Sequence, residues 1–165
     1  MEDKLSKEFL LSCINLEKWK SGQWSDVATI SRAIRKFLKA NNINCKVSSE
    51  IYSGGDSVTV KTFDEEQCIS EKLNEIFSIF EAGYFDGMND IYEYYQNGDE
   101  VPTTKYFFYR NEISEERFSK AVEFVKSEIF GCDEKNIYYY ARRLLEGQYS
   151  NNDLQEKSII GWWHK

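Results

Sequence analysis

Apolar side chains recur every three or four positions in two long stretches, which predicts two amphipathic helices. The first begins at Ser25 or Asp26, both good N-caps, and ends near Asn41. The second begins at Asp64 and ends before Gly83, which stands where a left-handed C-cap would lie. Each helix is expected to bury its apolar stripe against the rest of the fold.

Between these helices the pattern changes to alternation of apolar and polar residues. Period two over residues 44–52 and again over 56–63 predicts two strands of a hairpin. Gly54 and Gly55 at the turn supply positive φ without steric cost. Backbone N–H groups around two glycines also form anion-binding nests, but the lysine of a phosphate-binding loop is missing here. A further apolar run at 105–110 (KYFFYR) predicts a buried strand.

The two ends of the chain are expected to be helical. Residues 1–22 carry a weak helical pattern, Ser114 is a good N-cap, and 137–146 is another helix candidate. The resulting order predicts an α+β fold: a small antiparallel sheet, made of a hairpin and at least one further strand, packed against several helices. We expect one domain over 1–165, with a helical C-terminal extension from 114 to 165.

Composition removes several classes of function. His164 is the single histidine, which excludes Ser-His-Asp triads and sites with several histidine ligands. The four cysteines form no C-x-x-C pair, so we expect reduced thiols, mostly buried, rather than a zinc or redox site. No apolar run reaches the roughly 18 residues that a membrane span needs. A cytoplasmic protein without a cofactor or bound metal is therefore expected.

Charge is unevenly distributed along the chain, whose net charge is −7. Residues 47–105 contain thirteen acidic and three basic residues. Such a segment repels phosphate and attracts basic protein surfaces, although a solvated acidic face is the simpler interpretation. The candidate contacts for a basic partner are Asp56, Asp64, Glu65, Glu66, Asp86, Asp90, Asp99 and Glu100.

Four features occur in an order that resembles a known family. They are I-x-x-x-I-R-K-x-L at 30–38, a strand-turn-strand at 46–60 containing Y-S-G-G-D-S-V-T-V, F-D-G-M-N-D at 85–90, and K-Y-F-F-Y-R at 105–110. Together they resemble the large polyvalent protein-associated domain family, type twenty-nine, over about residues 26–113. The resemblance implies that the protein is encoded by a mobile genetic element, such as a phage or plasmid, and acts in a host cell. It implies no particular reaction.

These observations favour a non-enzymatic protein that binds a host protein or protein complex. The mobile-element context suggests inhibition of a defence nuclease complex, of the anti-CRISPR or anti-restriction type, through the acidic segment. A structural accessory module of a phage machine is one alternative. A metal-assisted hydrolase is another, because Asp86 and Asp90 on one helical face could share Mg²⁺. The same two residues equally fit a turn and a cap.

Two aromatic features of the sequence each have more than one interpretation. The runs at 105–110 and 137–143 interleave aromatic residues with arginine, as base-stacking surfaces do, but core packing and the acidic total charge argue against direct nucleic-acid binding. Trp162 and Trp163 near the C-terminus would either dock on the core or mediate self-association.

Overall fold

The computed structural model describes residues 4–95, 100–128 and 134–146. The chain divides into two compact units, Met1–Glu112 and Ile113–Lys165. The boundary lies next to residue 114, where the helical extension was expected to begin. The single domain expected over the whole chain remains a prediction.

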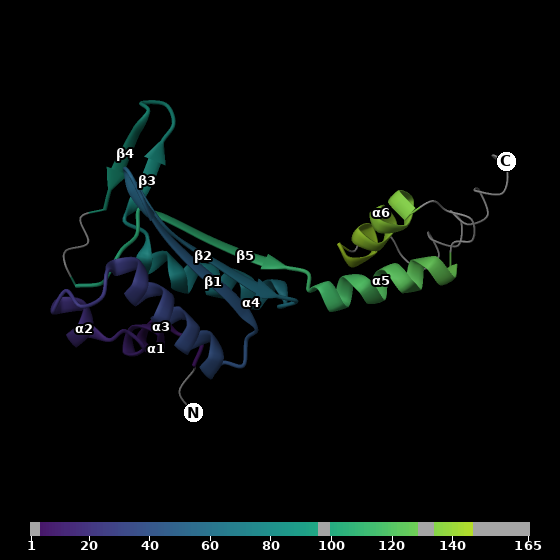
Figure 1. Ribbon diagram of the computed structural model, residues 1–165, viewed down its shortest axis with the longest axis horizontal. Helices are drawn as coiled ribbons and strands as arrows, with labels where there is room; N and C mark the ends of the chain where they lie inside the picture. Colours follow the sequence, from purple (N-terminus) through teal and green to yellow (C-terminus); the bar gives the residue numbers. More distant parts are fainter. Residues whose placement is uncertain (1–3, 96–99, 129–133, 147–165) are drawn as a thin grey trace. The chain divides into compact units, whose positions relative to one another are not determined.

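Helices and strands are mixed in the first unit, and the described part of the second unit is helical (Figure 1). The helices of the first unit are α1 (Lys7–Ser12), α2 (Leu16–Lys20), α3 (Asp26–Ala40), α4 (Gln67–Phe77) and the 3-10 helix η1 (Ser78–Phe80). The strands are β1 (Cys45–Tyr52), β2 (Gly55–Phe63), β3 (Gly83–Asp86), β4 (Ile91–Tyr94) and β5 (Tyr106–Glu112). The second unit contributes α5 (Glu115–Glu128) and α6 (Glu134–Leu145). The α+β class is confirmed.

Three strands form the main sheet in the order β1-β2-β5. The first two are antiparallel, joined by a two-residue turn in which Gly54 has φ +95°. The third strand, β5, pairs with β2 in parallel. The sheet is therefore mixed, whereas the sequence predicted an antiparallel sheet. The chain between β2 and β5 contains α4, and a helical crossover of this kind is the usual way to bring two strands into parallel alignment.

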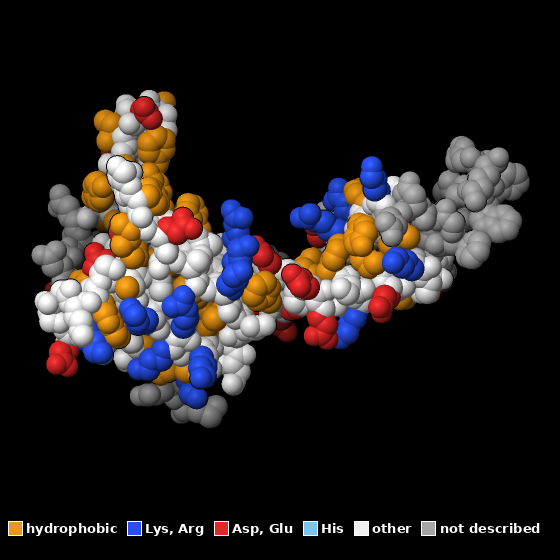
Figure 2. Space-filling model, in the orientation of Figure 1, with side chains coloured by type: hydrophobic (Ala, Val, Ile, Leu, Met, Phe, Trp, Pro, Cys, Tyr) orange, Lys and Arg blue, Asp and Glu red, His pale blue; other side chains and the backbone are white. Residues whose placement is uncertain are grey.

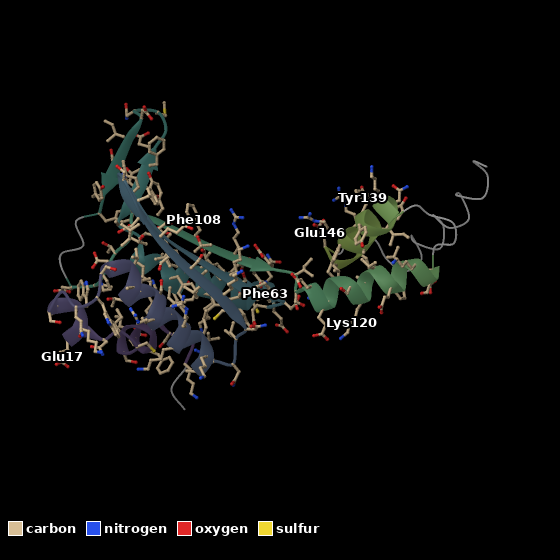
Figure 3. All side chains as sticks on the ribbon, viewed as in Figure 1. Glu17, Phe63, Phe108, Lys120, Tyr139 and Glu146 are labelled. Atoms are coloured by element: carbon tan, nitrogen blue, oxygen red, sulfur yellow. The ribbon has the colours of Figure 1, made fainter. Side chains whose placement is uncertain are left out.

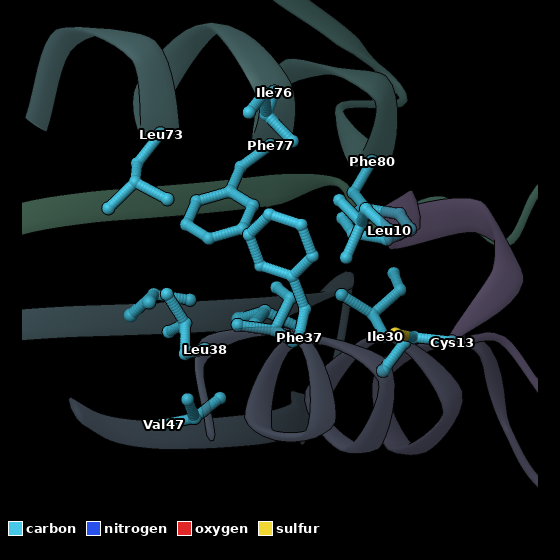
Figure 4. Packing of buried hydrophobic residues seen from close by; sticks show 14 of the residues in the cluster. Leu10, Cys13, Ile30, Phe37, Leu38, Val47, Leu73, Ile76, Phe77 and Phe80 are labelled. Carbon is cyan, nitrogen blue, oxygen red and sulfur yellow. The ribbon is translucent and has the colours of Figure 1, made fainter. Parts of the chain in front are cut away.

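The core lies between one face of this sheet and the helices α1, α3 and α4 (Figure 4). Phe77 of α4 is its centre: its ring centroid lies 6.0 Å from that of Phe37 in α3. On the sheet side it lies 6.0 Å from Phe107 and 5.6 Å from Tyr109. The prediction of a buried strand at 105–110 is therefore half right, because Phe108 points to the opposite face and is 46% exposed.

Helix α3 begins where the sequence predicts. Ser25 occupies the N-cap position without a side-chain hydrogen bond, and the Asp26 carboxylate instead accepts the indole N–H of Trp19 at 2.6 Å. Lys18 and Arg32 lie over the ring of Trp24, at 4.8 and 4.2 Å from its centroid. These contacts join α2 to the first turns of α3.

The boundaries predicted for the next helix are wrong at both ends. Asp64 does not cap α4; it has φ +60°, donates its N–H to the carbonyl of Glu112 at 3.0 Å, and leaves Glu66 at the N-cap position. Helix α4 ends at Phe77. Gly83 is not a C-cap but the first residue of β3.

The second unit is a pair of helices around a small apolar cluster. Val122 and Val125 of α5 pack with Ile137 and Ala141 of α6. The Ser114 hydroxyl accepts the N–H of Arg117 at 3.2 Å, which confirms the predicted N-cap.

Cys13, Cys45 and Cys68 are free thiols. Cys13 is buried, whereas Cys68 is exposed, so the expectation of mostly buried cysteines is wrong for the described residues. No helix among residues 4–95, 100–128 and 134–146 is long and apolar enough to cross a membrane.

Replacing the central core side chain should destabilise the first unit strongly. We expect Phe77→Ala to lower its free energy of unfolding by about 3–5 kcal/mol, since the substitution leaves a cavity next to Phe37, Phe107 and Tyr109. Urea denaturation followed by the amide NMR signals of α3 measures this loss. Phe85→Ala, at an exposed position, is the control and should change stability by no more than about 0.5 kcal/mol. Equal losses for the two variants would contradict the assigned core.

Candidate functional site

The segment that follows α4 forms a hairpin that the sequence did not predict. Strands β3 and β4 pair antiparallel from Gly83 opposite Tyr94 to Asp86 opposite Ile91. Gly83 is required there, because a Cβ atom would lie 1.9 Å from the carbonyl oxygen of Glu93. Each strand has only four residues, too few for an alternating pattern to stand out in the sequence.

Asp86 closes the turn of this hairpin. Its Oδ1 accepts the N–H of Met88 at 2.9 Å, and its Oδ2 accepts the amide group of Asn89 at 2.8 Å. The hydrogen bonds from Asn89 and Met88 hold the pKa of Asp86 below its ordinary value. Asp90 lies in the same turn with φ +54°. The turn alternative is thus the one observed for Asp86, and neither residue lies on a helix.

Large apolar side chains are exposed on the hairpin (Figure 2). The exposed fraction is 96% for Met88, 63% for Tyr94, and 56% for both Phe85 and Ile91. Their positions cover both strands and the turn, so the hairpin as a whole presents an apolar surface. The register places Phe85 and Tyr94 on one face of the hairpin and Ile91 on the other, so both faces expose apolar side chains. Exposed apolar side chains that gather on one element mark interaction sites more often than scattered single residues do.

Aromatic contacts and one lysine fix the base of the hairpin to the main sheet. The Tyr92 hydroxyl donates to the carbonyl of Lys105 at 2.5 Å, and its ring lies 5.8 Å from that of Tyr106. The Lys105 ammonium lies 5.4 and 5.5 Å from the centroids of these two rings and donates to the carbonyl of Gly54 at 2.9 Å. Burial raises the pKa of Tyr92. A shallow groove of about 190 Å³ lies between Tyr84, Tyr92 and the start of β5.

Asp56, expected as a surface contact, is a structural residue. Its Oδ1 accepts both the hydroxyl of Thr104 and the N–H of Lys105, each at 2.8 Å. Thr104 itself is buried. The carboxylate therefore holds the start of β5 against the start of β2.

The remaining predicted acidic contacts do not gather in one place. Asp64, Glu65 and Glu66 lie together after the end of β2, where burial and the two neighbouring charges raise the pKa of Glu65. Glu100 is exposed, and Asp99 lies outside the described residues, as do Trp162 and Trp163.

Carboxylates of the described residues do not converge on a metal-binding geometry. Asp86 uses both oxygens within its own turn, and Asp56 binds Thr104 and Lys105. Within residues 4–95, 100–128 and 134–146, no three His, Cys, Asp or Glu side chains form a group that could hold an ion.

Charge on the hairpin has a single sign. Asp86, Asp90 and Glu93 are its ionisable acidic residues, and the sequence contains no Lys or Arg between Lys72 and Lys105. The Tyr84 hydroxyl donates to the carboxylate of Glu93 across the strands. The contacts predicted from the sequence included Asp86 and Asp90 but missed the exposed apolar residues around them, which lie in an aromatic-rich segment without a helical period.

Comparison with protein-family models, curated proteins and solved structures finds no match to this chain. The resemblance to the type twenty-nine domain family stays a prediction.

The turn of the hairpin should respond to acid through Asp86. The pKa of Asp86 in the folded chain is lower than its ordinary value of 3.8. The carboxylate therefore stabilises the turn fully above pH 3.8 and loses this effect as the pH falls through its lowered pKa. We expect the backbone amide signal of Met88 to shift toward that of a disordered residue as the pH is lowered below 3.8. Asp86→Asn retains an accepting oxygen and should remove this titration, and an unchanged titration in the variant would assign the effect to another group.

Proposed function

We propose that this protein acts by binding another protein through the β3–β4 hairpin. The observation that carries the proposal is the exposure of Phe85, Met88, Ile91 and Tyr94 together on one protruding element. Exposed apolar groups of this size lower the free energy when a partner covers them. Aromatic residues and methionine are also the types enriched at the centres of protein interfaces.

The hairpin's charge narrows the kind of partner. Asp86, Asp90 and Glu93 border the apolar residues, and no cation lies in the hairpin to neutralise them. A complementary surface would carry apolar depressions edged by Lys or Arg. The interaction should therefore form faster at low salt than at high salt, since exposed charges steer association.

Surfaces that bind nucleic acid are basic, and this supports a finer proposal. In the mobile-element context implied by the sequence resemblance, the partner is a host defence nuclease complex, which the protein inhibits by occupying a basic channel in the manner of an anti-CRISPR or anti-restriction protein. Use of the same hairpin within a phage assembly is the competing assignment. No observation favours the metal-assisted hydrolase, because Asp86 and Asp56 are engaged in a turn and a strand tether.

Removing the apolar groups of the hairpin should abolish partner binding without unfolding the protein. Tagged wild-type protein, the double variant Met88→Ser/Ile91→Ser and a matched control, Leu11→Ser/Leu16→Ser, are compared by affinity capture from a bacterial host and mass spectrometry. All four replaced residues are exposed in the structure. We expect a protein retained by the wild type and the control, and reduced at least about tenfold by the hairpin variant.

The salt dependence separates the two uses of the hairpin. A captured nuclease complex that is released at high salt supports inhibition, whereas recovery of the protein's own copies or of phage components supports a structural role. Identical capture by all three proteins would show that the hairpin is not the contact surface.

A further inference from the structure

The main sheet has a second face, opposite the core. Val58 and Val60 of β2 point into the core together with Phe107 and Tyr109 of β5. Because side chains alternate along a strand, the residues between them point the other way. Helices α3 and α4 both lie on the core face, since Phe37 and Phe77 meet there. In the described part of this unit no helix covers the opposite face, which is termed here the open face (Figure 1).

Two aromatic side chains of β5, Tyr106 and Phe108, lie on the open face. Tyr106 and Phe108 have ring planes 2° apart and centroids 6.5 Å apart, and Figure 3 shows Phe108 on the side of the sheet away from α3. The register places Ser57 opposite Tyr106 and Thr59 opposite Phe108. Next to these small neighbours Phe108 is 46% exposed, whereas Tyr106 is half-buried and contacts Tyr92 and Lys105.

A row of cations crosses the open face two residues further along the strands, beyond Thr59 and Phe108. The register places Lys61 of β2 beside Lys46 of β1 on one side and beside Arg110 of β5 on the other. Arg110 lies two residues beyond Phe108, about 7 Å along the strand. Lys61 is paired with Glu112 at 2.7 Å. Glu50, the other acid on this face, lies beside Ser57, at the Tyr106 end.

The positive charge continues around the edge of β1 onto α3. Arg35 donates to the carbonyl of Val47 at 2.5 Å, next to Lys46. Arg32, Lys36 and Lys39 are exposed on the same helix. The sequence contains no Asp or Glu between Asp26 and Glu50. Figure 2 shows Lys and Arg side chains gathered over α3 and at the adjoining end of the sheet.

We propose that the open face binds single-stranded nucleic acid, with bases stacked on Tyr106 and Phe108 and phosphates bound by Lys46, Lys61 and Arg110. An aromatic platform beside a row of cations is the combination that single strands require, because every base offers a ring face and every nucleotide a charge. A duplex hides its base faces and does not fit. The negative total charge does not oppose this binding, since the acids of the hairpin and the cations Lys46, Lys61 and Arg110 lie on different elements.

This assignment uses other side chains than the protein contact proposed for the hairpin, and the two surfaces adjoin at the groove that Phe108 lines together with Phe85. A single strand bound on the open face would let the protein engage a nucleoprotein through both of its components.

Fluorescence anisotropy with labelled oligo-dT and oligo-U of about 12 nucleotides tests the proposal, with a duplex of the same length as the control. We expect both single strands to bind and the duplex to bind weakly or not at all. Phe108→Ala should weaken binding about 5- to 150-fold, the range for loss of one stacked base. Phe108→Tyr should restore it. Phe108 is partly exposed, so the alanine variant is expected to fold, and circular dichroism confirms this.

Salt gives a second, independent readout. Three cations on phosphates predict a slope of about −2 in a plot of log affinity against log salt, and Arg110→Gln should reduce that slope by about 0.7. Lys20→Gln, on α2, is the matched control and should leave the slope unchanged. Met88→Ser/Ile91→Ser should leave oligonucleotide binding intact, which separates this site from the hairpin.

Absence of binding to either single strand at about 50 mM salt would overturn the proposal. So would equal affinity of the wild type and Phe108→Ala. Loss of a captured protein in Phe108→Ala, with no oligonucleotide binding by the wild type, would assign the open face to a protein partner instead.

Discussion

The Asp56 carboxylate fixes how β5 enters the sheet, and both faces of the sheet depend on it. By accepting hydrogen bonds from Thr104 and from the N–H of Lys105, it sets Tyr106 opposite Ser57. A shift of one residue would turn Phe107 and Tyr109 out of the core and bring Tyr106 and Phe108 into it. One partly buried polar contact thus decides which aromatic residues build the core and which form a surface.

The same tether positions the hairpin. Lys105 follows Thr104 directly and accepts the hydroxyl of Tyr92 on its carbonyl, while its ammonium contacts the rings of Tyr92 and Tyr106. The apolar surface of the hairpin and the aromatic platform of the sheet are therefore held by one short segment. Their chemistry differs, because the hairpin combines apolar groups with carboxylates and the platform combines aromatic rings with cations.

Local patterns in the sequence predict much of this fold. The stripe of α3, the alternation of β1 and β2, the Gly54 turn and the Ser114 cap each depend on neighbours within a few positions, and all are observed. The parallel placement of β5 depends on a contact between residues far apart, which no local pattern encodes. The run KYFFYR predicts a buried strand in the sequence, and only the pleat of the sheet divides its aromatic residues between two faces. The candidate site was predicted in part: two of its acids were named, but the exposure of Met88 and Ile91 follows from a hairpin whose strands are too short to recognise.

Parallel closure of the sheet also has a consequence for the order of folding. Strands β1 and β2 are separated by a two-residue turn and can pair as soon as both exist, whereas Asp56 and Lys105 are 49 positions apart. Closing a loop of that length costs entropy before any contact repays it, so β5 docks late and contributes to a high contact order. During synthesis the chain must extend past residue 112 before the third strand can join. Until then Phe107 and Tyr109 do not pack against Val58 and Val60, so these valines stay partly uncovered. A chaperone that binds apolar strands would therefore have its longest access to the protein in that interval.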